Sequence, residues 1–272
     1  MEGNAGYSFT LDALRLPWPY SPASALVLPA PAPLLLGLGS IGLYALLYFV
    51  AWPRLLAPRS AQPAPAVEVL AQWHHGLLCA YSTLCCLAML AYLAAQGELA
   101  RPRAFFCAPL ASPALRLLSL SFTASKLVEW GDTMVLVARG KSAAQIGLLH
   151  SYHHATTFCL FLITVNFPST EKLGLLLNGL VHSAMYYHFA WKLPRWARPL
   201  ITAAQIVQLV FVTWAWWATP AWCPVEHGAF PQRRPIEFAA PFLMVPVYTL
   251  LFVEFFVRTY VLVSGKGEAK EA

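Results

Sequence analysis

Long apolar runs, separated by short segments rich in proline and charge, make up most of this chain. A helix needs about 20 mostly apolar residues to cross the hydrocarbon core of a bilayer. Seven runs are long enough, and they predict membrane spans at 32–52, 74–95, 114–137, 145–165, 170–190, 197–219 and 236–262. Because the connections are short, we expect a single all-α transmembrane domain that takes up residues 1–272.

Polar residues interrupt four of these runs. The third contains KLVEWGDT, the fourth HSYHH, the fifth NGLVHSAMYY and the sixth TAAQIVQ. Residues three or four apart share one face of a helix, as His150, His153 and His154 do. The candidates for one buried site are Lys126, Glu129, Asp132, Thr133, His150, His153, His154, Asn178, His182, Met185, Tyr186, Tyr187, Thr202, Gln205 and Gln208.

The distribution of lysine and arginine predicts an N-terminus outside the cytosol. The cytosolic segments then hold ten basic residues: Arg54, Arg59, Arg139, Lys141, Lys192, Arg195, Arg198, Arg258, Lys266 and Lys270. The opposite side holds six: Arg15, Arg101, Arg103, Lys172, Arg233 and Arg234. With this orientation Glu129, His153, His182 and Gln205 all lie about 12–13 Å from the cytosolic end of their spans. Ionisable groups at one depth in four spans indicate a functional site.

The composition agrees with a membrane protein. Hydrophobic residues make up 58% of the chain and charged residues only 11%, and the mean hydropathy is +0.57. A soluble domain has about 25% charged residues. The segment 1–29 lacks a basic start and is broken by four prolines, so we expect no cleaved signal peptide. The formal charge of +6 fits basic loops and an anionic substrate, and no dense basic run predicts binding to nucleic acid.

Eight histidines occur in the chain, and not all of them are candidates for the site. His74 and His75 come at the start of the second predicted span, so we place them in the membrane interface. His188 and His227 are interpreted as structural or surface residues. The remaining four, in HSYHH and at position 182, are too many for simple contacts between helices.

Two kinds of chemistry suit four buried histidines. The first is metal ligation, because H-x-x-H-H resembles one histidine box of the membrane di-iron desaturases and hydroxylases. The chain has no H-x-x-x-H partner box, however. Alternatively, neutral imidazoles would act as nucleophile and base, with Glu129 and Asp132 holding their tautomers. The third alternative is a lipid or ion carrier, in which polar residues would extend to both faces of the membrane.

The four motifs, in this order and spacing, resemble the fatty acid elongases of the ELO family, the very-long-chain 3-oxoacyl-CoA synthases. The match extends from Lys126 to Gln208. The resemblance implies seven helices around a substrate tunnel in the endoplasmic reticulum membrane. It also implies condensation of a long-chain acyl-CoA with malonyl-CoA, without a metal or other cofactor. The expected products are CO2, CoA and a 3-oxoacyl-CoA that is two carbons longer.

The resemblance assigns roles to individual residues. His153 would carry the acyl group, and His182 would assist decarboxylation or acyl transfer. His150 and His154 would polarise the site, and Asn178 and Gln205 would donate hydrogen bonds to substrate oxygens. We expect Lys126, Tyr186, Tyr187 and Gln208 to contact substrate. CoA phosphates would meet cytosolic cations: Arg139, Lys141, Lys192, Arg195, Arg198, Arg258 and Lys266.

One motif departs from the family pattern. The fifth span reads Met185-Tyr186-Tyr187-His188-Phe189 where the family usually has Met-Tyr-x-Tyr-Tyr, so two tyrosines are replaced. Which tyrosine touches CoA therefore stays open. The length and unsaturation of the acyl chain, and a homo-oligomeric state, stay open as well. The other enzymes of the elongation cycle are the expected partners.

The cysteines divide by location. Cys79, Cys85, Cys86 and Cys159 fall within predicted spans and are interpreted as packing residues. Cys107 and Cys223 fall in loops that the predicted orientation places in the lumen, where disulfides persist. We therefore predict a disulfide between Cys107 and Cys223. The dilysine retrieval signal at the C-terminus is incomplete, so residence in the endoplasmic reticulum rests on the resemblance.

Overall fold

The computed structural model describes residues 32–58, 63–108, 110, 112–164, 168–224, 228, 230–233 and 235–262. Within these ranges every regular element is a helix. The elements are α1 Ala32–Leu46, η2 Leu47–Ala51, α2 Trp52–Leu56, α3 Pro65–Ala95, η3 Glu98–Ala100, α4 Pro102–Cys107, α5 Pro113–Val128, α6 Trp130–Ala138, α7 Ala143–Thr164, α8 Pro168–Leu173, η4 Gly174–Asn178, α9 Gly179–Trp191, α10 Ala197–Trp222, α11 Phe230–Arg233, α12 Pro235–Phe256 and η5 Val257–Val261. The expectations for segment 1–29, Arg15, Arg59, His227, Arg234, Lys266 and Lys270 fall outside the described residues.

Proline and glycine mark several helix ends. Pro65 and Pro113 occupy first positions of their helices, where a missing N–H costs nothing. Ser112 caps α5 by accepting a hydrogen bond from the Leu115 N–H at 3.4 Å. Gly97 and Gly140 follow α3 and α6 with φ of 64° and 75°, the left-handed conformation that ends a helix.

Four helical segments are long and apolar enough to cross a membrane: Ala32–Leu56, Pro65–Ala95, Ala197–Trp222 and Pro235–Val261. This all-α chain is therefore a multi-pass membrane protein. The other three predicted spans fall on α5–α6, α7 and α8–α9, which are helical but carry the polar motifs. That all seven cross the membrane stays a prediction.

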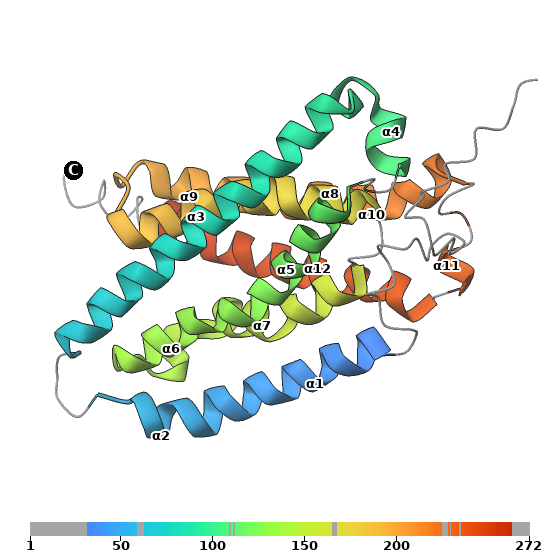
Figure 1. Ribbon diagram of the computed structural model, residues 1–272. Coiled ribbons are helices and arrows are strands. Elements are labelled where there is room, and N and C mark those ends of the chain that lie inside the picture. Colours follow the sequence, from blue (N-terminus) through green and yellow to red (C-terminus); the bar gives the residue numbers. More distant parts are fainter. Residues whose placement is uncertain are drawn as a thin grey trace, which may run out of the picture.

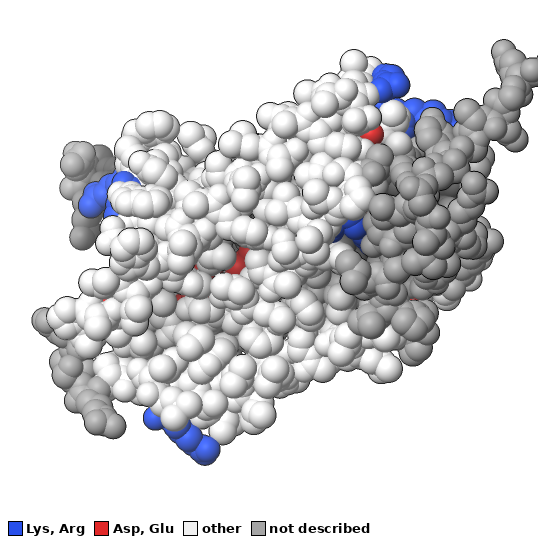
Figure 2. Space-filling view, in the orientation of Figure 1, with Lys and Arg blue, Asp and Glu red and all other residues white. Residues whose placement is uncertain are grey.

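The helices run between two ends of an elongated molecule (Figure 1). The α2–α3, α6–α7 and α9–α10 connections lie at one end, and α4 and α11 lie at the other. Within the bundle α3 packs along α9, α1 along α7 and α10 along α12. Figure 2 shows an almost uncharged surface between the ends, with Lys and Arg gathered towards the ends, as expected of a surface that faces lipid.

Two clusters of buried side chains join helices that are far apart in the sequence. Tyr44 and Trp52 of the first helical segment pack with Trp130 and Val137 of α6. Near the opposite end, Cys107 and Cys223 form the predicted disulfide, with a Cα–Cα distance of 5.4 Å, within a cluster that includes Phe106, Leu173 and Ala215. The disulfide ties the segment after α3 to the end of α10.

Candidate active site

Asp132 is the centre of the largest polar cluster. His74 Nε2 lies 3.0 Å and His75 Nε2 lies 3.4 Å from Asp132 Oδ1. The Tyr186 hydroxyl donates to Oδ2 at 2.8 Å, and His154 Nε2 lies 3.9 Å from the same oxygen. Three helices, α3, α7 and α9, thus bring side chains to one carboxylate on α6. A buried carboxylate needs such partners, because an unpaired charge in a protein interior is costly.

The placement of His74 and His75 in the membrane interface was wrong. His75 is only 6% exposed, and both rings contact Asp132. The error came from the span boundary. The helix begins at Pro65 and not at residue 74, so the histidines lie about 14 Å along it. Two adjacent ionisable residues at that depth were the signal that would have identified them.

A second cluster joins α5 to α9. Lys126 Nζ donates to Glu129 Oε1 at 2.6 Å and to Asn178 Oδ1 at 3.0 Å. His182 Nδ1 lies 3.5 Å from the same Glu129 oxygen. A π-helical turn, η4, ends at Asn178 immediately before α9. Such turns alter the face that a helix presents and are frequent at functional sites. The charges of Lys126 and Glu129 are therefore compensated inside the bundle.

A hydroxyl chain supports the first histidine of HSYHH. His150 Nε2 lies 2.9 Å from Thr133 Oγ1, which lies 2.9 Å from the Tyr44 hydroxyl. Gly147, three residues earlier, has a φ of 81° and interrupts the regular conformation of α7. Only glycine adopts that φ without strain. The kink sets the direction of the helix that carries the three histidines.

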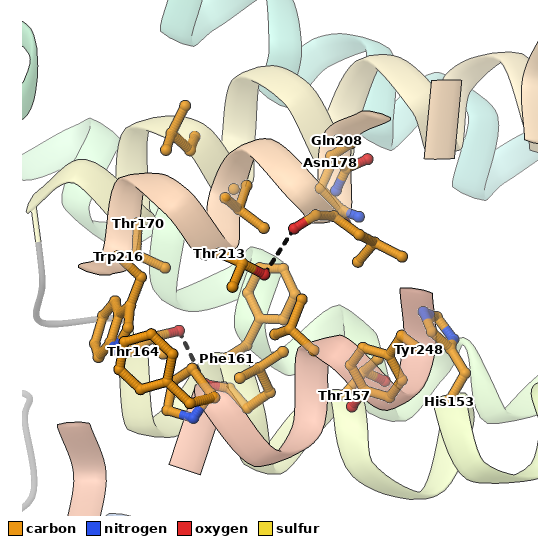
Figure 3. A pocket seen from close by; sticks show the side chains of 18 residues that line it. His153, Thr157, Phe161, Thr164, Thr170, Asn178, Gln208, Thr213, Trp216 and Tyr248 are labelled. Atoms are coloured by element: carbon orange, nitrogen blue, oxygen red, sulfur yellow. Dashed lines mark hydrogen bonds between the residues drawn. The ribbon is translucent and has the colours of Figure 1, made fainter. Parts of the chain in front are cut away.

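Two cavities meet at His153. The polar cavity has an empty volume of about 1830 Å³. Its lining includes Glu129, Asp132, His150, His153, His154, His182, Tyr186, Gln205, Arg198 and Arg258. The apolar cavity has an empty volume of about 780 Å³; most of its lining surface is apolar, and its described lining contains no Lys, Arg, Asp or Glu. Figure 3 shows His153 and Tyr248 near one end of the apolar cavity and Trp216 near the other. His153 lines both cavities.

His153 differs from its neighbours in its contacts. Its ring packs against Tyr248 at 5.3 Å and His154 at 5.4 Å between centroids. Among the described residues its ring has no hydrogen-bond partner, whereas His150 bonds Thr133. A neutral imidazole without a protein partner keeps a lone pair for an incoming group. His153 is therefore the histidine best placed to react with a molecule that fills both cavities.

The structure gathers most of the predicted site residues around the two cavities. Asn178 and Gln208 line the apolar cavity, and Gln205 lines the polar cavity while its amide points at Met185 Sδ, 3.6 Å away. Seven described candidates are absent from the lining of both cavities: Lys126, Thr133, Arg139, Lys141, Tyr187, Lys192 and Arg195. Arg139 instead forms an ion pair with Glu68, and Tyr187 is 46% exposed and packs on Trp191. Lys126 instead donates hydrogen bonds to Glu129 and Asn178.

Comparison with known proteins decides the family. The model of the ELO: GNS1/SUR4 family matches residues 33–268. The chain belongs to this family. As an ELO family member it is similar to long chain fatty acid elongase 1 of Caenorhabditis elegans, with 34% identity over 55% of this chain and 52% of the relative. It is also similar to very long chain fatty acid elongase 2 of Rattus norvegicus, with 32% identity over 54% and 53% of the two chains. The chain spans about half the length of these relatives.

Proposed function

We propose that this ELO family member condenses a long-chain acyl-CoA with malonyl-CoA. The products are CO2, CoA and a 3-oxoacyl-CoA two carbons longer. The observation that carries this proposal is the position of His153 at the junction of a polar and an apolar cavity. An acyl-CoA has the same division, with an anionic, polar half and a hydrocarbon half that meet at the thioester.

The first half-reaction is acyl transfer to His153. Its imidazole nitrogen attacks the thioester carbonyl, the C–S bond breaks, and the imidazole proton leaves with the CoA thiolate as CoASH. The hydrocarbon chain lies in the apolar cavity towards Trp216, which is 3% exposed. Asn178 and Gln208, which line that cavity, offer amide donors. Covalent transfer to a side chain replaces one difficult step by two easier ones.

The second half-reaction forms the carbon–carbon bond. Malonyl-CoA loses CO2, and the resulting carbanion attacks the acyl carbon, which breaks the bond to His153. His182, held 3.5 Å from Glu129, faces the polar cavity in which the malonyl group would lie. Gln205, on the same cavity, is the donor for a malonyl oxygen. Arg198 supplies positive charge for CoA phosphates, whereas Arg258, on the same cavity, is paired with Glu254 at 2.7 Å.

The cellular setting follows from the same proposal. We place the protein in the endoplasmic reticulum, with the N-terminus in the lumen and the C-terminus in the cytosol. The polar cavity then opens to the cytosol, where acyl-CoA is available. The disulfide Cys107–Cys223 then lies on the lumenal side, where oxidation is permitted. The partners are the reductases and the dehydratase that act on 3-oxoacyl-CoA.

We propose that the reaction requires no metal, and one experiment separates it from metal-dependent desaturation or hydroxylation. The purified protein in detergent is incubated with a panel of acyl-CoAs and radiolabelled malonyl-CoA, and metal content is measured on the same sample. A labelled product two carbons longer from metal-free protein supports the proposal. If no labelled product forms, and the protein instead desaturates or hydroxylates lipid in proportion to its bound iron, the alternative is established.

The role of His153 has a direct test. Intact-mass measurement after incubation with acyl-CoA alone should detect one added acyl group, and His153→Ala should remove it. His188 also lines the polar cavity, but its Nδ1 accepts a hydrogen bond from the Leu193 N–H at 2.9 Å. His188→Ala is therefore the matched control and should still be acylated. Acylation of the His153→Ala protein would remove this residue from the mechanism.

A further inference from the structure

The reacting histidine packs against a helix that carries none of the polar motifs. His153 belongs to α7, and its ring contacts Tyr248 and Phe252 of α12, with centroid distances of 5.3 and 6.2 Å. Both contacts are edge-to-face, with interplanar angles of 64° and 90°, an arrangement that aromatic rings prefer. Tyr248 and Phe252 are four residues apart and share one face of α12. The last helix therefore presents two rings to one imidazole.

The two rings belong to different sides of the cavity junction. Tyr248 lines the apolar cavity, Phe252 lines the polar cavity, and His153 lines both. Figure 3 shows Tyr248 beside His153 at one end of the apolar cavity. Under the proposed function the acyl chain occupies the apolar cavity and CoA the polar one. The rings therefore border His153 on the acyl side and on the CoA side.

A hydrogen bond fixes the first of these rings. The Tyr248 hydroxyl lies 2.6 Å from Thr156 Oγ1, and Thr156 Oγ1 donates to the backbone carbonyl of Tyr152 at 2.6 Å. A threonine hydroxyl has only one proton, so Tyr248 is the donor in its bond to Thr156. Tyr248 is 1% exposed and Thr156 is 7% exposed. This buried bond joins α12 to α7 within one turn of His153.

The His153 ring depends on packing for its orientation. Among the described residues neither of its ring nitrogens has a hydrogen-bond partner, whereas His150 Nε2 lies 2.9 Å from Thr133 Oγ1. The torsion that rotates a histidine ring has a broad energy profile, so an imidazole without a hydrogen bond needs another restraint. His154 packs on the ring at 5.4 Å from the same helix. The restraint from outside α7 comes from α12.

We propose that Tyr248 and Phe252 are positioning residues that orient the His153 imidazole for attack on the thioester. This inference rests on the proposed acylation of His153. The two rings exchange no atom or proton: the C–N bond forms, the C–S bond breaks and the imidazole proton leaves with CoASH. A nucleophile reacts efficiently only when its lone pair is aligned with the carbonyl, and a displacement of about 1 Å costs about 100-fold in rate.

The test follows acylation in a single turnover. Purified protein in detergent is mixed with a range of acyl-CoA concentrations and no malonyl-CoA, and CoA release and the mass of the acyl adduct are measured over time. For Tyr248→Leu we expect the maximal rate to fall about 100-fold, and for Phe252→Leu about 10-fold. The acyl-CoA concentration that gives half of the maximal rate should change by less than about threefold, because the rings act on His153 and not on binding.

A conservative variant separates the ring from its hydroxyl. Tyr248→Phe keeps the ring contact and loses the bond to Thr156, so its unfolding temperature should fall while its acylation rate stays within about fivefold of the wild type. Phe252 is only partly buried, so Phe252→Leu remains informative if Tyr248→Leu fails to fold. A Tyr248→Phe protein as slow as Tyr248→Leu would overturn orientation by the ring.

Phe256→Leu is the matched control for Phe252→Leu. Phe256 lies one turn further along α12 and is also partly buried, but it packs on Tyr260 at 5.4 Å and is absent from the described lining of both cavities. Its variant should keep the wild-type acylation rate. Equal losses in the two variants would indicate a general effect of α12 packing and would overturn the proposal.

A small reagent distinguishes orientation from loss of reactivity. Diethyl pyrocarbonate needs no placement in the two cavities, so it should modify His153 in both leucine variants as in the wild type, as located by fragment masses. A parallel loss of this modification would overturn the proposal, as would wild-type acylation rates in both variants. If the wild-type protein forms no adduct on His153, the proposed acyl transfer itself fails, and this inference fails with it.

Discussion

Lys126 Nζ and Glu129 Oε1 lie 2.6 Å apart in an ion pair whose side chains are 1% and 2% exposed. Either charge without its partner would be a buried, unpaired charge inside the bundle. Removing one partner of such a pair typically costs about 3–5 kcal/mol of folding free energy. The pair also fixes Asn178 and His182, so the polar motifs of α5 and α9 depend on it for position as well as for charge.

We predict that Lys126→Met and Glu129→Gln each destabilise the protein by about 3 kcal/mol or more, because each leaves a buried charge unpaired. The double variant Lys126→Met with Glu129→Gln should cost less than the sum. Thermal unfolding in detergent measures all three. The control is the exposed pair of Arg139 and Glu68, with side chains 28% and 51% exposed, for which Arg139→Gln should cost about 1 kcal/mol or less. Equal losses for the two pairs would contradict the prediction.

Gly37→Ala should destabilise the packing of α1 on α7. A Cβ at Gly37 would lie 2.4 Å from Cys159 Sγ and 3.0 Å from its Cα, and overpacking of this kind typically costs about 1–3 kcal/mol. Gly39, two residues later, has open space around it, so Gly39→Ala should be neutral or stabilising. Unfolding temperatures of the two variants compare them directly. Equal values would mean that α1 shifts freely on α7.

Gly131→Ala should also lower stability, because a Cβ at Gly131 would lie 2.5 Å from Cε1 of the His74 ring. The loss should depend on His74. In a His74→Ala background the added methyl group meets no ring, so the substitution should become neutral or gain up to about 1 kcal/mol from helix propensity. A double-mutant cycle from unfolding measurements gives the interaction energy. Additive effects would show that the two residues do not touch in the protein.

Removal of the disulfide should destabilise the chain without affecting the site directly. Cys107 and Cys223 are separated by 116 residues, and crosslinks that close long loops contribute about 2–5 kcal/mol. Cys107→Ser should lower the unfolding temperature by the same amount as reductant lowers that of the wild type. Non-reducing mass mapping checks the pairing. Cys79 is a free cysteine, so Cys79→Ser is the control. The unfolding temperature of this variant should still fall when reductant is added.

Arg198→Gln should raise KM for acyl-CoA and malonyl-CoA by about 10-fold with a smaller change in kcat, because a hydrogen bond from a charged group contributes about 1.5–3 kcal/mol. Arg198 lines the polar cavity, whereas its neighbour Arg195 is absent from the described lining. Arg195→Gln is therefore the control and should keep its KM. Steady-state kinetics at fixed ionic strength measures both. A matching rise in the two variants would indicate a general effect of surface charge.

Much of the site was predictable because helical spacing constrains side chains locally. His150, His153 and His154 had to share a face, and equal depth in four spans placed Glu129, His182 and Gln205 near them. Arg139 and Tyr187 show where such reasoning stops. Both lie close to the site in sequence, but Arg139 pairs with Glu68 from another helix, and Tyr187 lies on the opposite side of α9 from the cavity. Helical spacing predicts which residues share one face of a helix. Only the packing of the helices determines which residues that face contacts.

The sequence by itself determined an all-α membrane protein, its family motifs and the pairing of Cys107 with Cys223, because hydropathy, helical period and loop location are properties of short segments. The tertiary structure alone decided that His74 and His75 reach Asp132, and that His153 lies where a polar and an apolar cavity meet. These relations depend on the register and rotation of one helix against another. Side-chain contacts along the whole bundle set both, and no single segment encodes them.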